Sequence, residues 1–111
     1  MAIEDLYESI RERITRFLEE VEEPVSAEDI ARTFELEVSD VYIHLEHIAK
    51  SIRRESGNKK ILLMIPPRCR KCGYIFKDLE KPKKPSRCPK CKSERIEPPR
   101  FTVKSPESKS R

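Results

Sequence analysis

Apolar side chains recur every three or four positions along the start of the chain. This spacing predicts one amphipathic helix over residues 3–21, which ends before Pro24. The stripe is explained equally well by the core of a helical bundle and by the contact between two copies of a homodimer. Its members are Ile3, Leu6, Ile10, Ile14, Phe17, Leu18 and Val21.

Two further helices are predicted. Ser26, followed by Asp29 three positions later, resembles a capping box and indicates a short second helix around Ile30 and Phe34. Ser39 is placed to cap a third helix over residues 40–55. The buried face of the third helix is predicted to hold Val41, Leu45, Ile48, Ala49 and Ile52. A short second helix joined to the third by a tight turn is typical of a helix-turn-helix.

The pattern then changes to that of strands. Residues 60–65 and 100–104 are the two stretches that suit a strand, and no tight hairpin follows the first. We therefore expect the two to pair as a wing, with the cysteine-rich segment inserted between them. Pro66-Pro67 and Pro98-Pro99 mark the points where pairing stops, because proline cannot donate to a ladder.

The predicted fold is α+β: a winged helix-turn-helix with a four-cysteine zinc ribbon inserted in the wing hairpin. The winged-helix domain takes residues 1–66 plus 98–104, and the zinc ribbon takes residues 67–97. Residues 105–111 are rich in Ser and charged residues and are predicted to form a disordered tail.

No feature of the chain suggests a membrane or an export route. The longest apolar run, residues 61–65, is far too short to span a bilayer. The first ten residues, MAIEDLYESI, carry acids where a signal peptide needs basic residues. We therefore expect a cytoplasmic protein, in which cysteines serve as metal ligands rather than as disulfides.

Four cysteines form two C-x2-C pairs, Cys69 with Cys72 and Cys88 with Cys91. Each pair lets a tight turn aim two sulfurs at one point, and two pairs complete a tetrahedron. Four protein ligands leave no position for water, so the predicted site is structural and holds one zinc ion. The knuckles also resemble those of rubredoxins, which hold iron, and tetrahedral sulfur ligation suits either metal. The basic charge of the segment and the lack of Trp favour zinc over an iron electron carrier.

Charge is distributed very unevenly. Residues 1–56 carry 7 Lys/Arg and 15 Asp/Glu, a net charge of −8, whereas residues 57–111 carry 17 and 5, a net charge of +12. A basic half of this kind indicates a polyanionic partner, above all double-stranded DNA.

Charged residues make up 40% of the chain, with no Gln and one Asn, which is typical of heat-adapted proteins.

The candidate nucleic-acid contacts lie at the end of the third helix and in the segment that follows. They are Lys50, Arg53, Arg54, Lys59, Lys60, Arg70, Lys71, Lys83, Lys84, Arg87, Lys90 and Lys92. The first half of the third helix is instead acidic, with Asp40 and Glu46, and presents Ile43 to solvent. This surface suits a protein partner at least as well as a DNA groove.

The sequence contains no combination of residues that indicates catalysis. It offers no phosphate loop, no paired carboxylates and no serine, histidine and acid in a plausible setting, so we expect a non-enzymatic protein. His44 and His47 are expected to be surface or boundary residues, because no acid or cysteine close in sequence completes a site with them.

The chain resembles a small archaeal family of predicted transcriptional regulators, in which a helix-turn-helix is fused to a rubredoxin-like zinc ribbon. The resemblance rests on PVSAEDIARTFELEVSDVYIHLEHIAKSI (24–52), PPRCRKCGYIF (66–76) and CPKC (88–91). It implies a winged-helix fold, a zinc site at the four cysteines and a role in transcription. The leading hypothesis is a DNA-binding regulator, the second is a protein-interaction module of the transcription machinery, and an iron electron carrier is a distant third.

Overall fold

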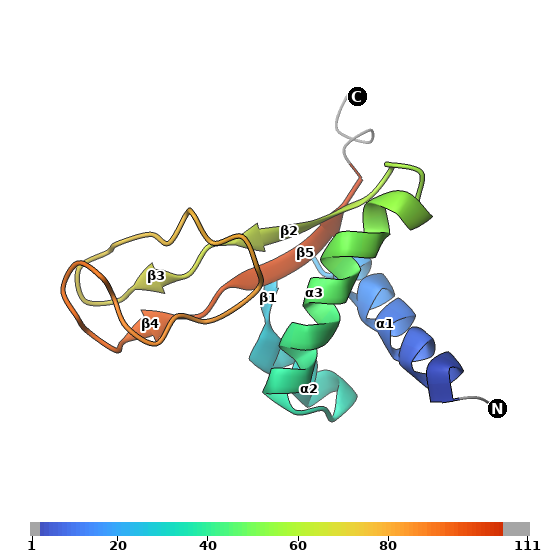
Figure 1. The fold of residues 1–111 in the computed structure, drawn as a ribbon, viewed down its shortest axis with the longest axis horizontal. Helices are drawn as coiled ribbons and strands as arrows, with labels where there is room; N and C mark the ends of the chain where they lie inside the picture. The colour runs from blue at the N-terminus through green and yellow to red at the C-terminus, as the bar shows by residue number, and fades with distance from the viewer. Residues whose placement is uncertain (1–2, 106–111) are drawn as a thin grey trace.

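The computed structural model describes residues 3–105, with side chains from Ile10 onward. The chain is mixed α+β, as predicted, with three helices and two antiparallel sheets (Figure 1). In order, the elements are α1 (Ile3–Glu20), β1 (Val25–Ser26), α2 (Ala27–Phe34), α3 (Val38–Glu55), β2 (Ile61–Ile65), β3 (Arg68–Cys69), β4 (Ile96–Glu97) and β5 (Arg100–Lys104). Within residues 3–105, no helix combines the length and apolarity required to cross a bilayer.

The first two helices lie where the periodicity placed them. The predicted capping box is present at the start of α2, where Asp29 N–H donates to Ser26 Oγ at 3.1 Å and Ser26 N–H donates to Asp29 Oδ2 at 3.2 Å. The helix ends at Glu35, which takes a left-handed conformation with φ of 58°. Ile14 and Leu18 of α1 are fully buried in the core, so this part of the apolar stripe serves the helical bundle.

The predicted start of α3 is wrong by two residues. The helix begins at Val38, and the residue before it, Glu37, is extended with ψ of 144°. Val41 N–H already donates to the carbonyl of Glu37, at 3.1 Å. Because the left-handed turn at Glu35 reverses the chain quickly, Ser39 lies inside the first helical turn and cannot cap it.

Two side chains of α3 also differ from the prediction. Ala49 is exposed, because it lies about 100° around the helix from Ile48, at the margin of the buried face. His44 is only 6% exposed, whereas His47 is exposed as expected. The burial of His44 follows from its partner on α1, since Arg11 Nε donates to His44 Nδ1 at 3.0 Å.

The larger sheet completes the helical core. Its strand order is β1-β5-β2, and β2 pairs with β5 in antiparallel register from Ile61 with Lys104 to Ile65 with Arg100. This pairing confirms the predicted association of two strands that lie far apart in the sequence. Phe101 and Val103 of β5 pack in the same buried cluster as Ile30 and Leu45. β1 was not predicted; it has only two residues and pairs with the other edge of β5.

The smaller sheet continues the register of the larger one. Ile65 pairs with Arg100, and three residues further along each strand Arg68 pairs with Glu97. The two Pro-Pro pairs therefore lie opposite each other, at the steps where neither strand has an N–H to donate. Figure 1 shows the result: the cysteine-rich segment projects from the helices as an extension of the β2–β5 pair.

Acid should destabilise the protein through His44. Burial, followed by the positive charge of Arg11, lowers the pKa of His44 below its usual value of 6.5, against the opposing effect of Asp40, while His47 lowers it further. The unfolded chain then binds the proton more readily, so stability is fully present above pH 6.5 and is lost as the pH falls below it.

Urea unfolding at pH 7.5 and pH 5.5 would measure this loss. We expect the free energy of unfolding of the His44→Gln variant to depend less on pH over this range than that of the parent. His47→Gln is the control, because His47 is exposed. The same pH dependence in the His44 variant and the parent would contradict the assignment.

Candidate metal centre

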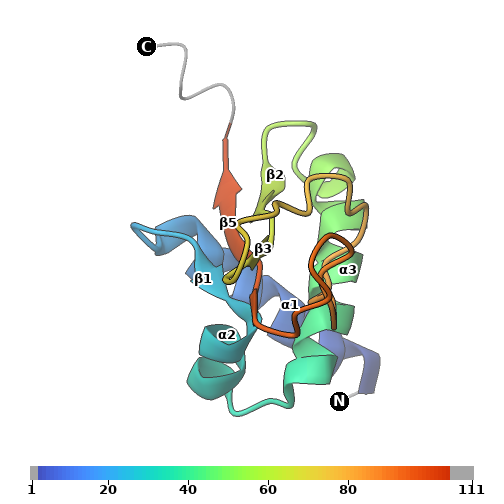
Figure 2. The same ribbon diagram turned by 90° about the vertical axis from the view of Figure 1, so that its left-hand side faces the viewer.

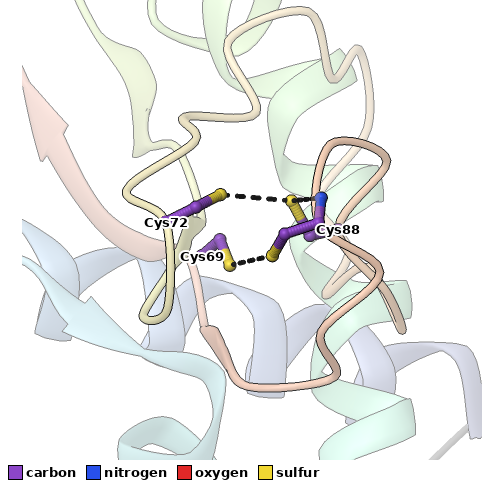
Figure 3. Close-up of side chains that lie close together, drawn as sticks. Cys69, Cys72 and Cys88 are labelled. Atoms are coloured by element: carbon purple, nitrogen blue, oxygen red, sulfur yellow. Dashed lines mark hydrogen bonds between the residues drawn. The ribbon is translucent and has the colours of Figure 1, made fainter.

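The four cysteine sulfurs converge on one point. All four lie within 4.8 Å of one another, with Cys69 Sγ 3.5 Å from Cys91 Sγ and Cys72 Sγ 3.6 Å from Cys88 Sγ (Figure 3). A tetrahedral zinc ion with bonds of about 2.3 Å places its sulfurs about 3.8 Å apart. The predicted ligand set therefore fits one tetrahedral metal ion, held by four thiolates.

The two C-x2-C pairs have the same backbone construction. In the first, Gly73 N–H donates to the carbonyl of Cys69 at 2.9 Å, and Cys69 N–H donates to the carbonyl of Tyr74 at 2.8 Å. In the second, Lys92 N–H donates to the carbonyl of Cys88, and Cys88 N–H donates to the carbonyl of Ser93, both at 2.8 Å. Both knuckles require a left-handed residue directly after the second cysteine.

Gly73 and Lys92 occupy these equivalent positions, with φ of 84° and 69°. Glycine adopts this conformation at no steric cost, whereas a residue with a Cβ pays for it. The first knuckle is therefore relaxed and the second carries backbone strain.

Backbone N–H groups favour the thiolate form of the two buried sulfurs. The N–H of Cys72 is the main cause that lowers the pKa of Cys69 to about 6. Burial opposes ionisation of Cys88, but the N–H groups of Cys91 and Lys90, 3.4 and 3.3 Å from its sulfur, hold its pKa below the usual value. Such N–H groups stabilise thiolate ligands for a metal.

Cys91 behaves in the opposite way. The N–H of Ser93 favours its thiolate, yet burial and the sulfurs of Cys69, Cys72 and Cys88 together raise the pKa of Cys91 to about 11. A metal ion must displace this proton to complete the site, so metal affinity should increase with pH.

Little else holds this part of the chain together. Its buried cluster consists of Cys69, Cys88 and Ile96, with Tyr74 and Phe76 partly buried against it. The rings of Tyr74 and Phe76 meet edge to face, with centroids 5.0 Å apart. So small a cluster cannot offset the conformational entropy of the segment, and metal binding must supply the difference.

The structure separates the predicted nucleic-acid contacts into three groups. Lys50 pairs with Glu46 at 3.6 Å, while Arg53 and Arg54 are exposed on the last turn of α3, and Lys59 follows them. Lys60 points away from this group, because its ammonium pairs with Glu19 of α1. The remaining contacts are exposed on the ribbon: Arg70, Lys71, Lys83, Lys84, Arg87, Lys90 and Lys92.

Two relevant side chains are missing from the predicted contacts. Lys81 reaches α3, where its Nζ lies 3.6 Å from Glu46 Oε2. Arg95 lies beside Arg70, because Arg70 N–H donates to the carbonyl of Arg95 at 2.8 Å. The register that pairs residue 65 with residue 100 indicates this second neighbour directly, but nothing in the sequence indicates the first.

Removing the metal should unfold the ribbon and lower the thermal stability of the helices. Without the ion, the connection between β2 and β5 becomes a long flexible loop, whose closure costs on the order of 2 kcal/mol more than that of a tight turn. We expect chelation, or Cys88→Ser, to abolish amide protection over residues 68–97 while α1 and α3 remain helical at a lower Tm. Hydrogen exchange and far-UV circular dichroism measure the two effects, and an unchanged Tm would contradict the coupling.

Exchanging the left-handed residues of the two knuckles should have opposite effects. Gly73→Ala should destabilise the metal-loaded ribbon by about 1 kcal/mol, although a Cβ at this position meets no atom within 4 Å. Lys92→Gly should relieve strain and leave stability equal or slightly higher. Thermal unfolding and competition with a chelating dye would measure both, and equal losses in the two variants would refute the backbone explanation.

Comparison with known proteins agrees with the two parts of the fold. A family described as PF0610-like, N-terminal, matches residues 9–61, and one described as the PF0610 rubredoxin-like zinc beta-ribbon domain matches residues 66–108. The chain is similar to the solution NMR structure of protein PF0610 from Pyrococcus furiosus, with a TM-score of 0.66. The two are 38% identical, over 86% of this chain and 89% of that one. No curated protein matches the chain.

The four converging sulfurs thus lie within the part of the chain that matches a zinc ribbon. By this likeness and by the geometry of its cysteines, the chain belongs to the PF0610 family, in which an N-terminal domain is joined to a rubredoxin-like zinc β-ribbon.

Proposed function

We propose that the chain is a cytoplasmic, non-enzymatic DNA-binding regulator of transcription, whose zinc ribbon supplies the contact with the phosphate backbone. The observation that carries this proposal is a surplus of basic side chains on the ribbon, most of which form no ion pair within residues 3–105. Among residues 3–105, ion pairs engage Arg68, Lys81 and Arg87 of the ribbon. Eight others are exposed and form no ion pair within the same range: Arg70, Lys71, Lys77, Lys83, Lys84, Lys90, Lys92 and Arg95.

The position of α3 supports the same partner. One of the two acids that argued against DNA on this helix, Glu46, lies 3.6 Å from both Lys50 and Lys81. Its negative charge is therefore compensated from within the helix and from the ribbon. Arg53 and Arg54 extend the basic surface at the end of the helix. A duplex lying along the ribbon and the end of α3 would meet mainly positive charge.

The arrangement of the helices and the larger sheet supports a winged-helix interpretation. A short α2 joins α3 through a tight turn, and the β2–β5 pair follows α3 as a wing would. On this interpretation the ribbon lengthens the wing. Four thiolates around one ion leave no open coordination position, which favours a structural metal over a catalytic one.

A protein partner is the second candidate function, and Ile43 is the observation that favours it. This side chain is 51% exposed near the start of α3, beside the partly buried Tyr42. An exposed branched apolar residue on a helix that also carries Asp40 suits a protein surface better than a phosphate backbone.

Fluorescence anisotropy of the zinc-loaded protein with random duplex DNA at several salt concentrations would test the first candidate. We expect micromolar binding that weakens steeply with salt. Lys83→Glu combined with Lys84→Glu should weaken binding and flatten the salt dependence, whereas Glu46→Gln should strengthen binding by removing the acid next to Lys50 and Lys81.

Glu12→Gln is the matched control for the last variant, because Glu12 is an exposed acid on α1, away from the ribbon. If random duplex fails to bind even at low salt, the DNA-binding proposal is wrong and the protein-partner function takes its place. In that case the surface around Ile43 is the one to mutate.

A further inference from the structure

Two arginines, Arg70 and Arg95, lie next to each other just beyond the paired strands β3 and β4. Arg70 N–H donates to the carbonyl of Arg95 at 2.8 Å, directly after the last β3–β4 pair, Cys69 with Ile96. The two residues also line the same hollow of the ribbon, so their positive side chains border one space.

Like charges that border one small space repel each other unless an anion lies between them. The nearby pair of Arg68 and Glu97 shows the alternative, because these paired residues have opposite charges that lie 3.5 Å apart. No ion pair within residues 3–105 engages either Arg70 or Arg95. Arg70 and Arg95 are therefore two neighbouring positive charges that no acid of the described chain compensates by an ion pair.

These arginines border a hollow. It has a volume of about 500 Å³ and is lined by Arg70, Lys84, Glu94, Arg95, Ile96 and Pro98. The one carboxylate among them, Glu94, lies 3.8 Å from Arg87, which partly neutralises it. Three positive side chains from three segments of the ribbon thus meet at one concave surface.

We propose that this hollow binds a single phosphate group between Arg70 and Arg95, with Lys84 as the third cation. Paired guanidinium groups present parallel N–H donors that match the oxygens of a phosphate, and a dianion or diester there removes the repulsion between the arginines. The inference rests on the proposed function, in that the phosphate is assigned to a nucleic-acid backbone. It distinguishes one specific contact from the diffuse attraction of the other lysines.

The test is a titration of the zinc-loaded full chain with inorganic phosphate at constant ionic strength, followed by NMR of the arginine Nε–Hε signals. We expect the signals of Arg70 and Arg95 to move together along one saturable curve. Arg95→Gln should reduce phosphate affinity by about 10-fold or more. Lys90→Gln is the control, because Lys90 is an exposed, unpaired cation of the same ribbon outside the hollow.

A second variant separates binding from folding. Arg95→Glu gives Arg70 an opposite charge, so it should raise the Tm of the ribbon while abolishing phosphate binding. Small, unsaturated shifts spread over all the arginines, or equal effects of Arg95→Gln and Lys90→Gln, would overturn the phosphate site.

Duplex binding distinguishes this inference from the function on which it rests. If Arg95→Gln weakens duplex binding more than Lys90→Gln does, the site is supported as a backbone contact. If both variants bind duplex equally well, the inference is wrong and DNA binding by the rest of the ribbon stands. Saturable phosphate binding without any duplex binding overturns the assignment to a nucleic acid.

Discussion

The helical core of this protein is finished by a residue that follows the zinc ribbon. Phe101 is fully buried among the helices, and Val103, on the same strand, is 4% exposed. The chain must therefore leave the core after β2, build the ribbon and return in register before the core is closed. Each residue that is left flexible in between increases the entropy that this return must offset. The zinc site and the prolines are best understood as the means of holding the return in place.

A continuous register fixes the direction of the ribbon. Four prolines interrupt the hydrogen bonds between β2–β5 and β3–β4, but they do not change which residues face each other. Pro67 and Pro99 are also fully buried, so the interruption is packed rather than loose. Because proline has a fixed φ and no N–H, the junction is stiff and cannot recruit another strand. The metal then holds together the cysteine end of the ribbon, while the β2–β5 pairing aligns the end that joins the helices.

The sequence predicts the elements better than their contacts. Periodicity is enough to place α1 and α2, and the spacing of Cys69, Cys72, Cys88 and Cys91 is enough to predict the metal centre. Pairing of β2 with β5 is predictable because residues 100–104 are the one other stretch of the sequence that suits a strand of this length. The N-terminal residue of α3 is not predictable in this way. Ser39 is a good capping residue by type, and only the tight turn at Glu35 places it inside the helix.

The burial of His44 depends on a neighbour supplied by another helix. No local pattern shows that Arg11 of α1 donates to its ring. The contact between Lys81 and Glu46 depends in the same way on how the long loop of the ribbon returns to α3. Contacts of this kind come from tertiary packing, which one-dimensional patterns do not contain.

The opposite charges of the two halves favour collapse of the ribbon onto the helices, which would neutralise both. The structure largely prevents it: among residues 3–105, Lys81 with Glu46 is the one ion pair between the ribbon and the helices. Figure 1 shows the ribbon projecting to one side of the helices, and Figure 2 looks at the molecule from that side. A flexible joint would allow the lysines to fold back on the acids of α1 and α3. The paired strands with their flanking prolines restrict this movement of the lysines. Their charge therefore stays exposed to solvent and to any anion that approaches.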